Sequence, residues 1–186
     1  MDTAPVEHLV VMGVSGTGKS SVGRGVAARL DRPFVEGDDL HPEANVAKMS
    51  SGVALTDDDR WPWLAAVRDA MTEHARAGRS TVVACSALRR VYRATLTAAE
   101  GRVRFVLLDV PADLLRVRVA QRQGHWMPPA LLESQLALLE PLQADEDGVT
   151  VHVRGDVEAT VADALRLLGE QDARDGAAAT GSRAAG

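Results

Sequence analysis

Cysteine and long apolar runs are the features that this 186-residue sequence most clearly lacks. Cys85 is the only cysteine, so the chain cannot form an internal disulfide, and a reducing compartment is the natural expectation. No apolar stretch approaches the length of a membrane span, and the first residues show neither a basic start nor a signal-type apolar segment. We therefore expect a cytoplasmic protein that has no membrane partner.

A surplus of positive charge is also missing. The formal net charge is −5 and the pI is near 5.5, which argues against a general surface for nucleic acid or anionic membranes. Hydrophobic residues make up 46% of the chain, enough for a core, and the length suits one domain. The composition predicts a single enzyme-sized domain without a nucleic-acid partner, and it leaves room for a local basic pocket.

Lysine and asparagine are scarce as well. Lysine occurs only at Lys19 and Lys48 and asparagine only at Asn45, whereas every other basic residue apart from histidine is arginine. Lys19 lies in a glycine-rich stretch, where a flexible point charge suits phosphate better than the planar guanidinium of arginine. Lys48 is either an ordinary surface lysine or a second functional cation, and composition alone leaves both readings open.

A phosphate-binding loop is the strongest local pattern. Residues 13–20, Gly-Val-Ser-Gly-Thr-Gly-Lys-Ser, fit G-x-x-x-x-G-K-[ST], with an apolar strand pattern at 9–12 and a helical pattern over 20–30. Backbone N–H groups of such a loop, and the following helix N-terminus, bind phosphate. Lys19 is expected to reach the β- and γ-phosphates of ATP, and the Ser20 hydroxyl to hold Mg²⁺. The predicted ATP-binding residues here are Gly13, Val14, Ser15, Gly16, Thr17, Gly18, Lys19, Ser20 and Ser21. A glycine-rich turn without a ligand is the weaker alternative.

Strand and helix patterns alternate along the rest of the chain. We expect further strands at 34–38, 80–85, 103–108 and 149–153, and helices at 42–49, 58–77, 87–99, 111–123, 129–140 and 157–168. This alternation predicts an α/β domain with a mostly parallel sheet and helices on both faces. Ligands bind outside the carboxyl ends of such strands, which would gather Asp38, Ser86 and Asp109 near the phosphate loop. We predict one domain over residues 1–172 and a disordered tail over 173–186, where the apolar period stops.

Asp38, at the end of the second predicted strand, is the candidate for the acceptor side of phosphoryl transfer. That reaction needs positioning, neutralisation of charge and an oriented nucleophile. A carboxylate at this place can orient or deprotonate an acceptor hydroxyl, or help to hold Mg²⁺ through water. A loop aspartate in an Asx-turn is the alternative. His41 follows three residues later on the same loop.

A small lid is predicted at about residues 118–130. Arg118 and Arg122 are four residues apart, so they share one face of a helix and are suited to gripping phosphates. The Gly-His-Trp-Met-Pro-Pro link at 124–129 could close over the site and exclude water, which would otherwise compete with the acceptor hydroxyl. Trp126 is either part of this lid or a core residue.

Several sequence blocks together resemble gluconate kinases, the gluconokinase family. They are residues 13–20, Glu36-Gly-Asp-Asp-Leu-His-Pro42, Asn45-Val-Ala-Lys-Met49, 57–64, 85–93, Gly124-His-Trp-Met127 and Ser134-Gln135, in order within residues 9–153. The phosphate loop is shared by a very large superfamily, whereas the second and third blocks are far more specific. The resemblance implies a three-layer P-loop kinase fold with a five-stranded parallel sheet in the order 2-3-1-4-5, and often a homodimer. It also implies ATP-dependent phosphorylation of D-gluconate at its terminal hydroxyl, giving 6-phosphogluconate.

The resemblance also implies roles for single residues. Lys19, Asp38 and Arg122 would be catalytic, and Arg118 and Arg122 would bind the phosphates of ATP. The implied substrate-binding residues are Asp38, His41, Lys48, Arg89, His125 and Gln135, and the implied metal-binding residues are Ser20 and Asp38. Two departures stand out: Leu108-Asp109-Val110 replaces a Leu-Lys-Gly type sequence, and Trp126 stands where phenylalanine is common.

Three other functions compete with this interpretation. A shikimate-type or nucleoside-monophosphate kinase would share the loop, the sheet and the lid, but not the blocks around Asp38 and Lys48. A GTP-driven switch protein normally uses an Asn-Lys-x-Asp stretch, and Val46 follows the only asparagine. A non-catalytic nucleotide-binding module is disfavoured by the joint presence of Lys19, Asp38 and the lid arginines, and only turnover excludes it.

Overall fold

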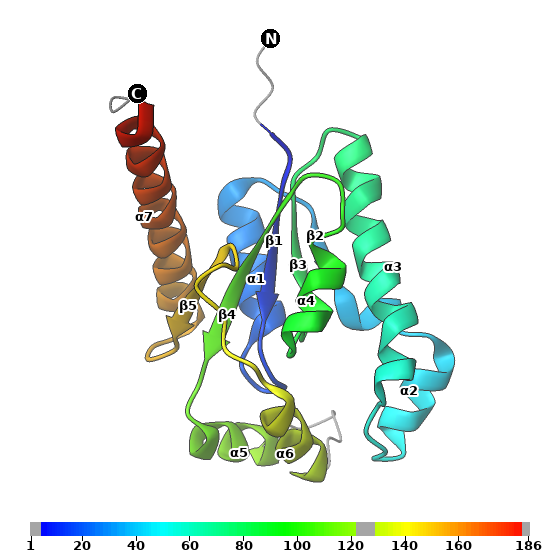
Figure 1. The fold of residues 1–186 in the computed structure, drawn as a ribbon. Coiled ribbons are helices and arrows are strands. Elements are labelled where there is room, and N and C mark those ends of the chain that lie inside the picture. Colours follow the sequence, from blue (N-terminus) through cyan, green and yellow to red (C-terminus); the bar gives the residue numbers. More distant parts are fainter. Residues whose placement is uncertain (1–4, 122–128, 184–186) are drawn as a thin grey trace.

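A five-stranded parallel sheet in the order β2-β3-β1-β4-β5 forms the centre of the molecule (Figure 1). The computed structural model describes residues 5–121 and 129–183. The strands are β1 (Glu7–Met12), β2 (Phe34–Glu36), β3 (Thr81–Ala84), β4 (Arg102–Asp109) and β5 (Gly148–His152). The helices are α1 (Lys19–Leu30), the 3₁₀-helix η1 (Gly37–Leu40), α2 (Glu43–Ser50), α3 (Asp57–Arg76), α4 (Arg90–Leu96), α5 (Ala112–Gln121), α6 (Pro129–Leu138) and α7 (Val157–Arg183). The predicted α/β class and strand order are confirmed.

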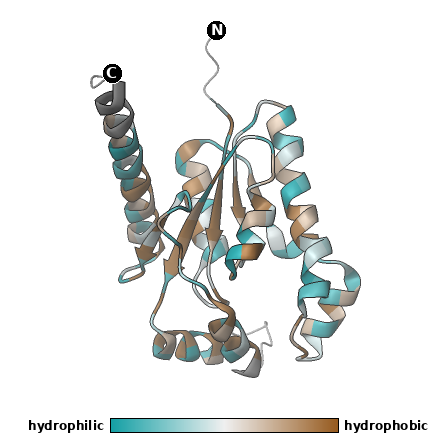
Figure 2. Cartoon of the chain, in the orientation of Figure 1, coloured by the Kyte–Doolittle hydropathy of each residue, from teal (hydrophilic) through white to brown (hydrophobic). Residues whose placement is uncertain are grey.

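Two apolar cores lie on opposite faces of this sheet, because successive strand side chains point to opposite sides. Leu9 and Val11 of β1 belong to the core that α1 and α7 cover. Val10 and Met12 belong to the other core, to which α3 and α4 contribute. Figure 2 shows the resulting continuous hydrophobic colour of the central strands. Among the described helices, none combines the length and the apolar character that a membrane crossing requires.

The C-terminal helix α7 departs from the prediction of a disordered tail over residues 173–186. The helix continues to Arg183, which overlaps most of that segment. Alanine-rich sequence favours helix, and acids of α7 pair with arginines of β4: Asp172 with Arg104 at 3.1 Å and Asp175 with Arg102 at 3.9 Å. The apolar period could not reveal this continuation, because the contacts of Asp172 and Asp175 with β4 are made by charged side chains.

The strand and helix ends around the sheet edge also differ from the prediction. Strand β2 stops at Glu36, because the backbone turns into the 3₁₀-helix η1 at Gly37. Gly37 also lies so close to β3 that an added Cβ would be 2.4 Å from the Ala84 carbonyl oxygen. Helix α4 begins at Arg90, three residues later than predicted, because Ala87 adopts a left-handed φ of 42° that a helix cannot contain. Both irregular segments lie at the carboxyl end of the sheet, where the predicted site lies.

A buried arginine on α4 ties this helix to the loop before β5. The Arg93 side chain is 1% exposed, and its Nε and Nη2 donate to Glu146 at 2.6 and 2.8 Å. Its Nη1 donates to the carbonyl oxygens of Ala87, Leu88 and Glu140. Arg93→Met removes one partner of a buried ion pair, so we expect the free energy of unfolding to fall by about 3–5 kcal/mol, measured by urea denaturation.

Arg90→Met is the matched control for this prediction. Arg90 lies on the same helix but is exposed and pairs with Asp145 at 2.6 Å, so its loss should cost at most about 1 kcal/mol. The hydrogen bonds from Arg93 lower the pKa of Glu146, so the pair stabilises the fold above the ordinary glutamate pKa, and that stabilisation is lost as the pH falls. Equal losses in the two variants would contradict the proposed anchor.

Candidate active site

The phosphate loop connects β1 to α1 and turns around one carbonyl oxygen. Thr17 Oγ1 and Lys19 Nζ donate to the Val14 carbonyl at 2.9 and 3.1 Å. Gly16 adopts a φ of 85°, and an added Cβ would lie 3.0 Å from a methyl group of Val119 on α5. A side chain at position 16 is therefore excluded both by backbone conformation and by the helix packed over the loop. The first residues of α1 expose the N-terminal N–H groups that favour an anion.

A cleft opens beside this loop at the carboxyl end of the sheet. Its lining includes five of the predicted residues, namely Ser15, Lys19, Asp38, His41 and Gln135. Ser86, which was expected near the loop, also lines the cleft. These residues come from four different segments, and only the parallel sheet and its crossovers bring them together. Gln135 of α6 contacts the loop directly, because its Oε1 accepts a hydrogen bond of 2.7 Å from the Ser15 N–H.

The acceptor wall of the cleft is built on η1 and α3. The His41 ring stacks on Trp63 with centroids 4.2 Å apart and planes 14° apart, and Trp63 Nε1 donates to the Gly37 carbonyl at 2.7 Å. These contacts hold η1, and with it Asp38, against α3. Burial lowers the pKa of His41, although the nearby charge of Asp38 opposes that shift. His41 is therefore neutral at pH 7 and suited to hydrogen bonding with hydroxyl groups.

Lys48 lies on α2 and is not among the residues that line the cleft. Its Nζ donates to both carboxylate oxygens of Asp59 at 2.8 Å, and this contact is the main reason that the pKa of Asp59 falls to about 2. The Asn45 side chain donates to the Asp59 carbonyl oxygen at 2.8 Å, so α2 is clamped to the start of α3. A direct contact of Lys48 with substrate stays a prediction.

Arg89 and Asp109 also lie outside the lining of the cleft. Arg89 Nη1 donates to Asp57 Oδ2 at 2.8 Å, so a substrate contact for Arg89 likewise stays a prediction. The Asp109 carboxylate lies 2.7 Å from His152 Nδ1 between the ends of β4 and β5, and its expected place near the phosphate loop stays a prediction. Its carboxylate is thereby held at the β5 side of the sheet.

The predicted lid is only partly described. Arg118 lies on α5, one residue before the Val119 that packs on Gly16, and it forms no ion pair with any residue of 5–121 or 131–177. Arg122, His125 and Trp126 lie outside the described residues. The lid role of this region and the phosphate contacts of both arginines therefore stay predictions.

Arg60 is a residue of the cleft to which the sequence analysis assigned no role. It lines the cleft from the first turn of α3, and its side chain is 12% exposed. Trp63, Met49, Leu131 and Ser134 join the lining as well. The only signal in the sequence was a single cation directly after three acids, Asp57 to Asp59, within a block quoted for the family resemblance. That signal does not show which way the cation points.

The fold and the site together define a class of protein. A parallel sheet in this order, a phosphate loop after its first strand and a carboxylate across the adjoining cleft define a small P-loop kinase. Residues 9–142 match a family model described as an AAA domain.

Relatives of known activity narrow the class to one family. A gluconokinase of Gluconobacter oxydans is 46% identical over 164 residues, which cover 88% of this chain and 92% of that protein. The solved structure of a gluconokinase from Sinorhizobium meliloti 1021 is 44% identical with a TM-score of 0.79, covering 89% of this chain and 93% of that chain. The chain belongs to the gluconokinase family.

A shikimate kinase from Aquifex aeolicus provides the contrast. Its structure covers 89% of this chain and 98% of its own, but with 16% identity and a TM-score of 0.58 it shares the fold alone. The shikimate-type alternative is therefore disfavoured.

Proposed function

We propose that this protein transfers the γ-phosphoryl group of ATP to the terminal hydroxyl of D-gluconate. The observation that supports this proposal most is that Lys19 of the phosphate loop and Asp38 of the acceptor wall line the same cleft. Membership of the gluconokinase family supplies the substrate class. The products would be ADP and 6-phospho-D-gluconate.

The nucleotide side of the reaction is the phosphate loop. Its backbone N–H groups and the N-terminus of α1 would hold the β- and γ-phosphates, with Lys19 neutralising the charge that develops during transfer. The Lys19 ammonium already lies at the loop, 3.1 Å from the Val14 carbonyl oxygen. A short movement of a flexible side chain would bring it onto the phosphates, so little reorganisation is required.

The acceptor side is centred on Asp38. The hydroxyl oxygen of gluconate forms the new bond to phosphorus while the bond from phosphorus to the β–γ bridging oxygen breaks. Asp38 would accept the hydrogen bond from that hydroxyl and take its proton. His41, neutral at pH 7, and Gln135 would bind the remaining hydroxyl groups.

A magnesium ion fits the residues at this site. Within 5–121 and 129–183, no three histidine, cysteine or acidic side chains are grouped as a metal cage. Mg²⁺ needs no such cage, because it keeps several waters and binds through one or two protein oxygens and the phosphates of the nucleotide. Ser20, on the first turn of α1, and Asp38, directly or through water, would be those protein ligands. When bound, the ion would neutralise phosphate charge.

Water must be kept from the γ-phosphate, since it would compete with the sugar acid. Helices α5 and α6 lie at the phosphate loop, through Val119 beside Gly16 and Gln135 on Ser15. We propose that they carry the lid over residues 118–130, with Arg118 and Arg122 facing the phosphates.

A coupled assay of ADP release tests the proposal. With ATP and Mg²⁺, we expect gluconate to raise ADP release far above the rate without acceptor, to a turnover of about 1–100 s⁻¹ as in other kinases. Shikimate and AMP, offered in parallel, should leave the rate near that of ATP alone. Stimulation by shikimate or AMP but not by gluconate would show that the assignment is wrong.

A further inference from the structure

The proposed function leaves one question of chemistry open, namely which cation receives the carboxylate of gluconate. Among the described residues that line the cleft, the permanently charged cations are Lys19 and Arg60. Lys19 belongs to the phosphate loop and would be occupied by ATP. We propose that Arg60 binds the carboxylate and thereby selects sugar acids over neutral sugars. This inference rests on the proposed function.

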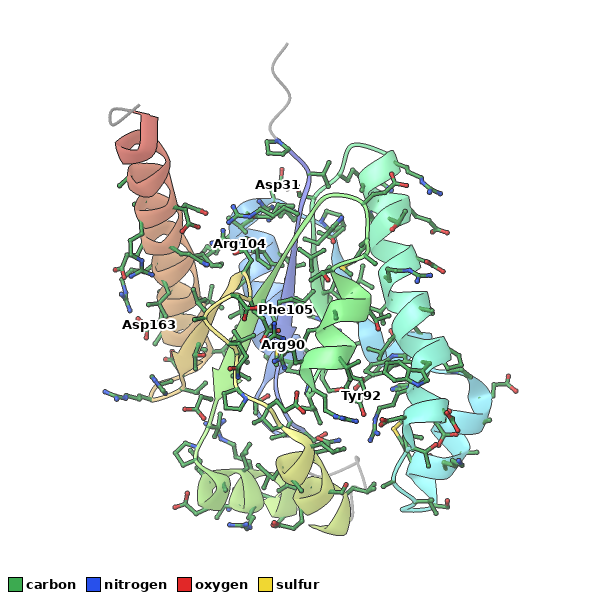
Figure 3. The ribbon with its side chains drawn as sticks, in the orientation of Figure 1. Asp31, Arg90, Tyr92, Arg104, Phe105 and Asp163 are labelled. Carbon is green, nitrogen blue, oxygen red and sulfur yellow. The ribbon has the colours of Figure 1, made fainter. Side chains whose placement is uncertain are left out.

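The guanidinium of Arg60 is held in place by neighbouring side chains, but these contacts do not use all of its hydrogen-bond donors. Its Nη1 donates to the Tyr92 hydroxyl at 3.3 Å and lies 3.5 Å from Asp57 Oδ1. Its central carbon lies 5.6 Å from the centroid of the Tyr92 ring, and Figure 3 shows Tyr92 on the side of α4 that faces α3. Both of these contacts with described residues use Nη1 alone. The Nε and Nη2 donors remain for a carboxylate, which arginine binds with two parallel hydrogen bonds.

Asp57 does not neutralise Arg60 in a tight pair. Its Oδ2 accepts a 2.8 Å hydrogen bond from Arg89, and its Oδ1 accepts one from the Tyr92 hydroxyl. These partners lower the pKa of Asp57, with the Tyr92 hydrogen bond as the largest cause, so the carboxylate is charged at pH 7. Arg89 also lies 3.5 Å from Glu140. Asp57 and Glu140 thus mainly neutralise the charge of Arg89. The contact between Arg60 and Asp57 is longer, at 3.5 Å, and leaves Arg60 able to bind an external anion.

The other cations near this wall are held by acids of the same helix. Lys48 donates to both oxygens of Asp59, and Arg89 donates to Asp57, and neither lines the cleft. Three successive acids begin α3, and the two outer ones bind cations: Asp57 accepts a hydrogen bond from Arg89, and Asp59 accepts hydrogen bonds from Lys48. Arg60, the next residue, lines the cleft. This arrangement explains why the sequence alone could not show which basic residue would bind the carboxylate of gluconate.

The residues of the acceptor wall also suggest how the sugar acid would be oriented in the cleft. Asp38, His41 and Arg60 all line this cleft. The charges of Asp38 and Arg60 act on the pKa of His41 in opposite directions, Asp38 raising it and Arg60 lowering it. A sugar acid with its reacting hydroxyl at Asp38 would extend past His41 and place its carboxylate at Arg60. Its two ends would then be recognised by groups of opposite charge.

Substrate discrimination in an Arg60→Gln variant tests this inference. D-Glucitol is the probe, because it carries the same terminal hydroxyl as D-gluconate but no carboxylate. We expect Arg60→Gln to raise the KM for gluconate by roughly ten- to a hundredfold, with the KM for ATP unchanged. The ratio of kcat/KM for gluconate to that for glucitol should fall by the same factor, whereas a merely structural role would lower both values equally.

Two further variants complete the design. Arg68→Gln is the matched control, since Arg68 lies on the same helix, pairs with Asp69 at 2.7 Å and is outside the cleft lining; it should leave both kinetic constants unchanged. Arg60→Lys keeps the positive charge but loses the pair of parallel donors of the guanidinium group. Its KM for gluconate should therefore rise less than that of Arg60→Gln. It also serves as the test if Arg60→Gln does not fold, as judged by circular dichroism.

Three results would overturn the inference. An unchanged gluconate KM in Arg60→Gln would do so, and so would equal losses with gluconate and glucitol. If Arg89→Gln, and not Arg60→Gln, lost discrimination, the carboxylate would bind at Arg89. In all three cases the unmodified protein still phosphorylates gluconate, so the proposed function survives. A lack of gluconate turnover in the unmodified protein would instead overturn that function, and the Arg60 assignment with it.

Discussion

Replacing Lys19 by alanine is expected to lower the turnover of gluconate by on the order of 10²-fold or more while the protein keeps its fold. The ammonium group would neutralise charge on the transferring phosphoryl group, and this interaction is strongest in the transition state. The structure adds a reason why the fold should survive. Lys19 donates a hydrogen bond to the Val14 carbonyl of its own loop, and Thr17 also donates to this carbonyl through its hydroxyl.

Steady-state kinetics at saturating gluconate and ATP, with circular dichroism of both proteins, would measure this effect. Arg24→Ala is the matched control, because Arg24 is a cation on the same helix whose side chain is 56% exposed and whose contact with Glu36 is long, at 3.5 Å. We expect the control to retain near-normal turnover. Near-normal turnover in Lys19→Ala as well would rule out the role proposed for this lysine.

Asp38→Asn should reduce kcat by roughly 10²- to 10⁴-fold, the usual contribution of a positioned acid or base, with a modest change in KM. Asparagine keeps the size of the side chain but neither takes a proton nor attracts a metal ion. The affected contacts matter most while the phosphoryl group moves, so the loss should fall on kcat and kcat/KM alike. The cleft places this carboxylate with Lys19, as such a role requires.

The neighbouring residue offers a sharp comparison for Asp38. Asp39 lies in the same 3₁₀-helix and carries the same charge, but it is not among the residues that line the cleft. Asp39→Asn should therefore leave kcat within about twofold of the unmodified enzyme, well below one kcal/mol of barrier. If both variants lost activity equally, the effect would come from the charge or folding of η1, and Asp38 would have no special part in the chemistry.

The phosphate loop was predictable because its determinants are local. Residues 13–20 contain the glycines, the lysine and the serine that the loop needs, and the apolar strand and the helix lie on either side of it in the sequence. The order of the strands came from the family resemblance and is confirmed. Periodicity alone left the ends of elements uncertain, as at α4, where one left-handed residue, Ala87, delays the helix.

The extension of α7 was not predictable from hydrophobic pattern. Asp172 and Asp175 are ordinary acids in an alanine-rich segment, and their partners Arg102 and Arg104 lie about seventy residues earlier in the chain. Ion pairs between distant segments leave no periodic signal. The same is true of Arg93, whose burial depends on a carboxylate from the loop before β5.

By itself, the sequence predicted a phosphate loop at residues 13–20 and placed Asp38 shortly after the second strand of the sheet. Both follow from short stretches whose backbone geometry and strand polarity are locally encoded. Only the tertiary structure decided which basic residues face the cleft. Lys48 and Arg89 are turned toward Asp59 and Asp57, whereas Arg60 enters the cleft. A cation's role depends on which carboxylates the fold brings within a few ångströms, because electrostatic attraction acts across space and not along the chain.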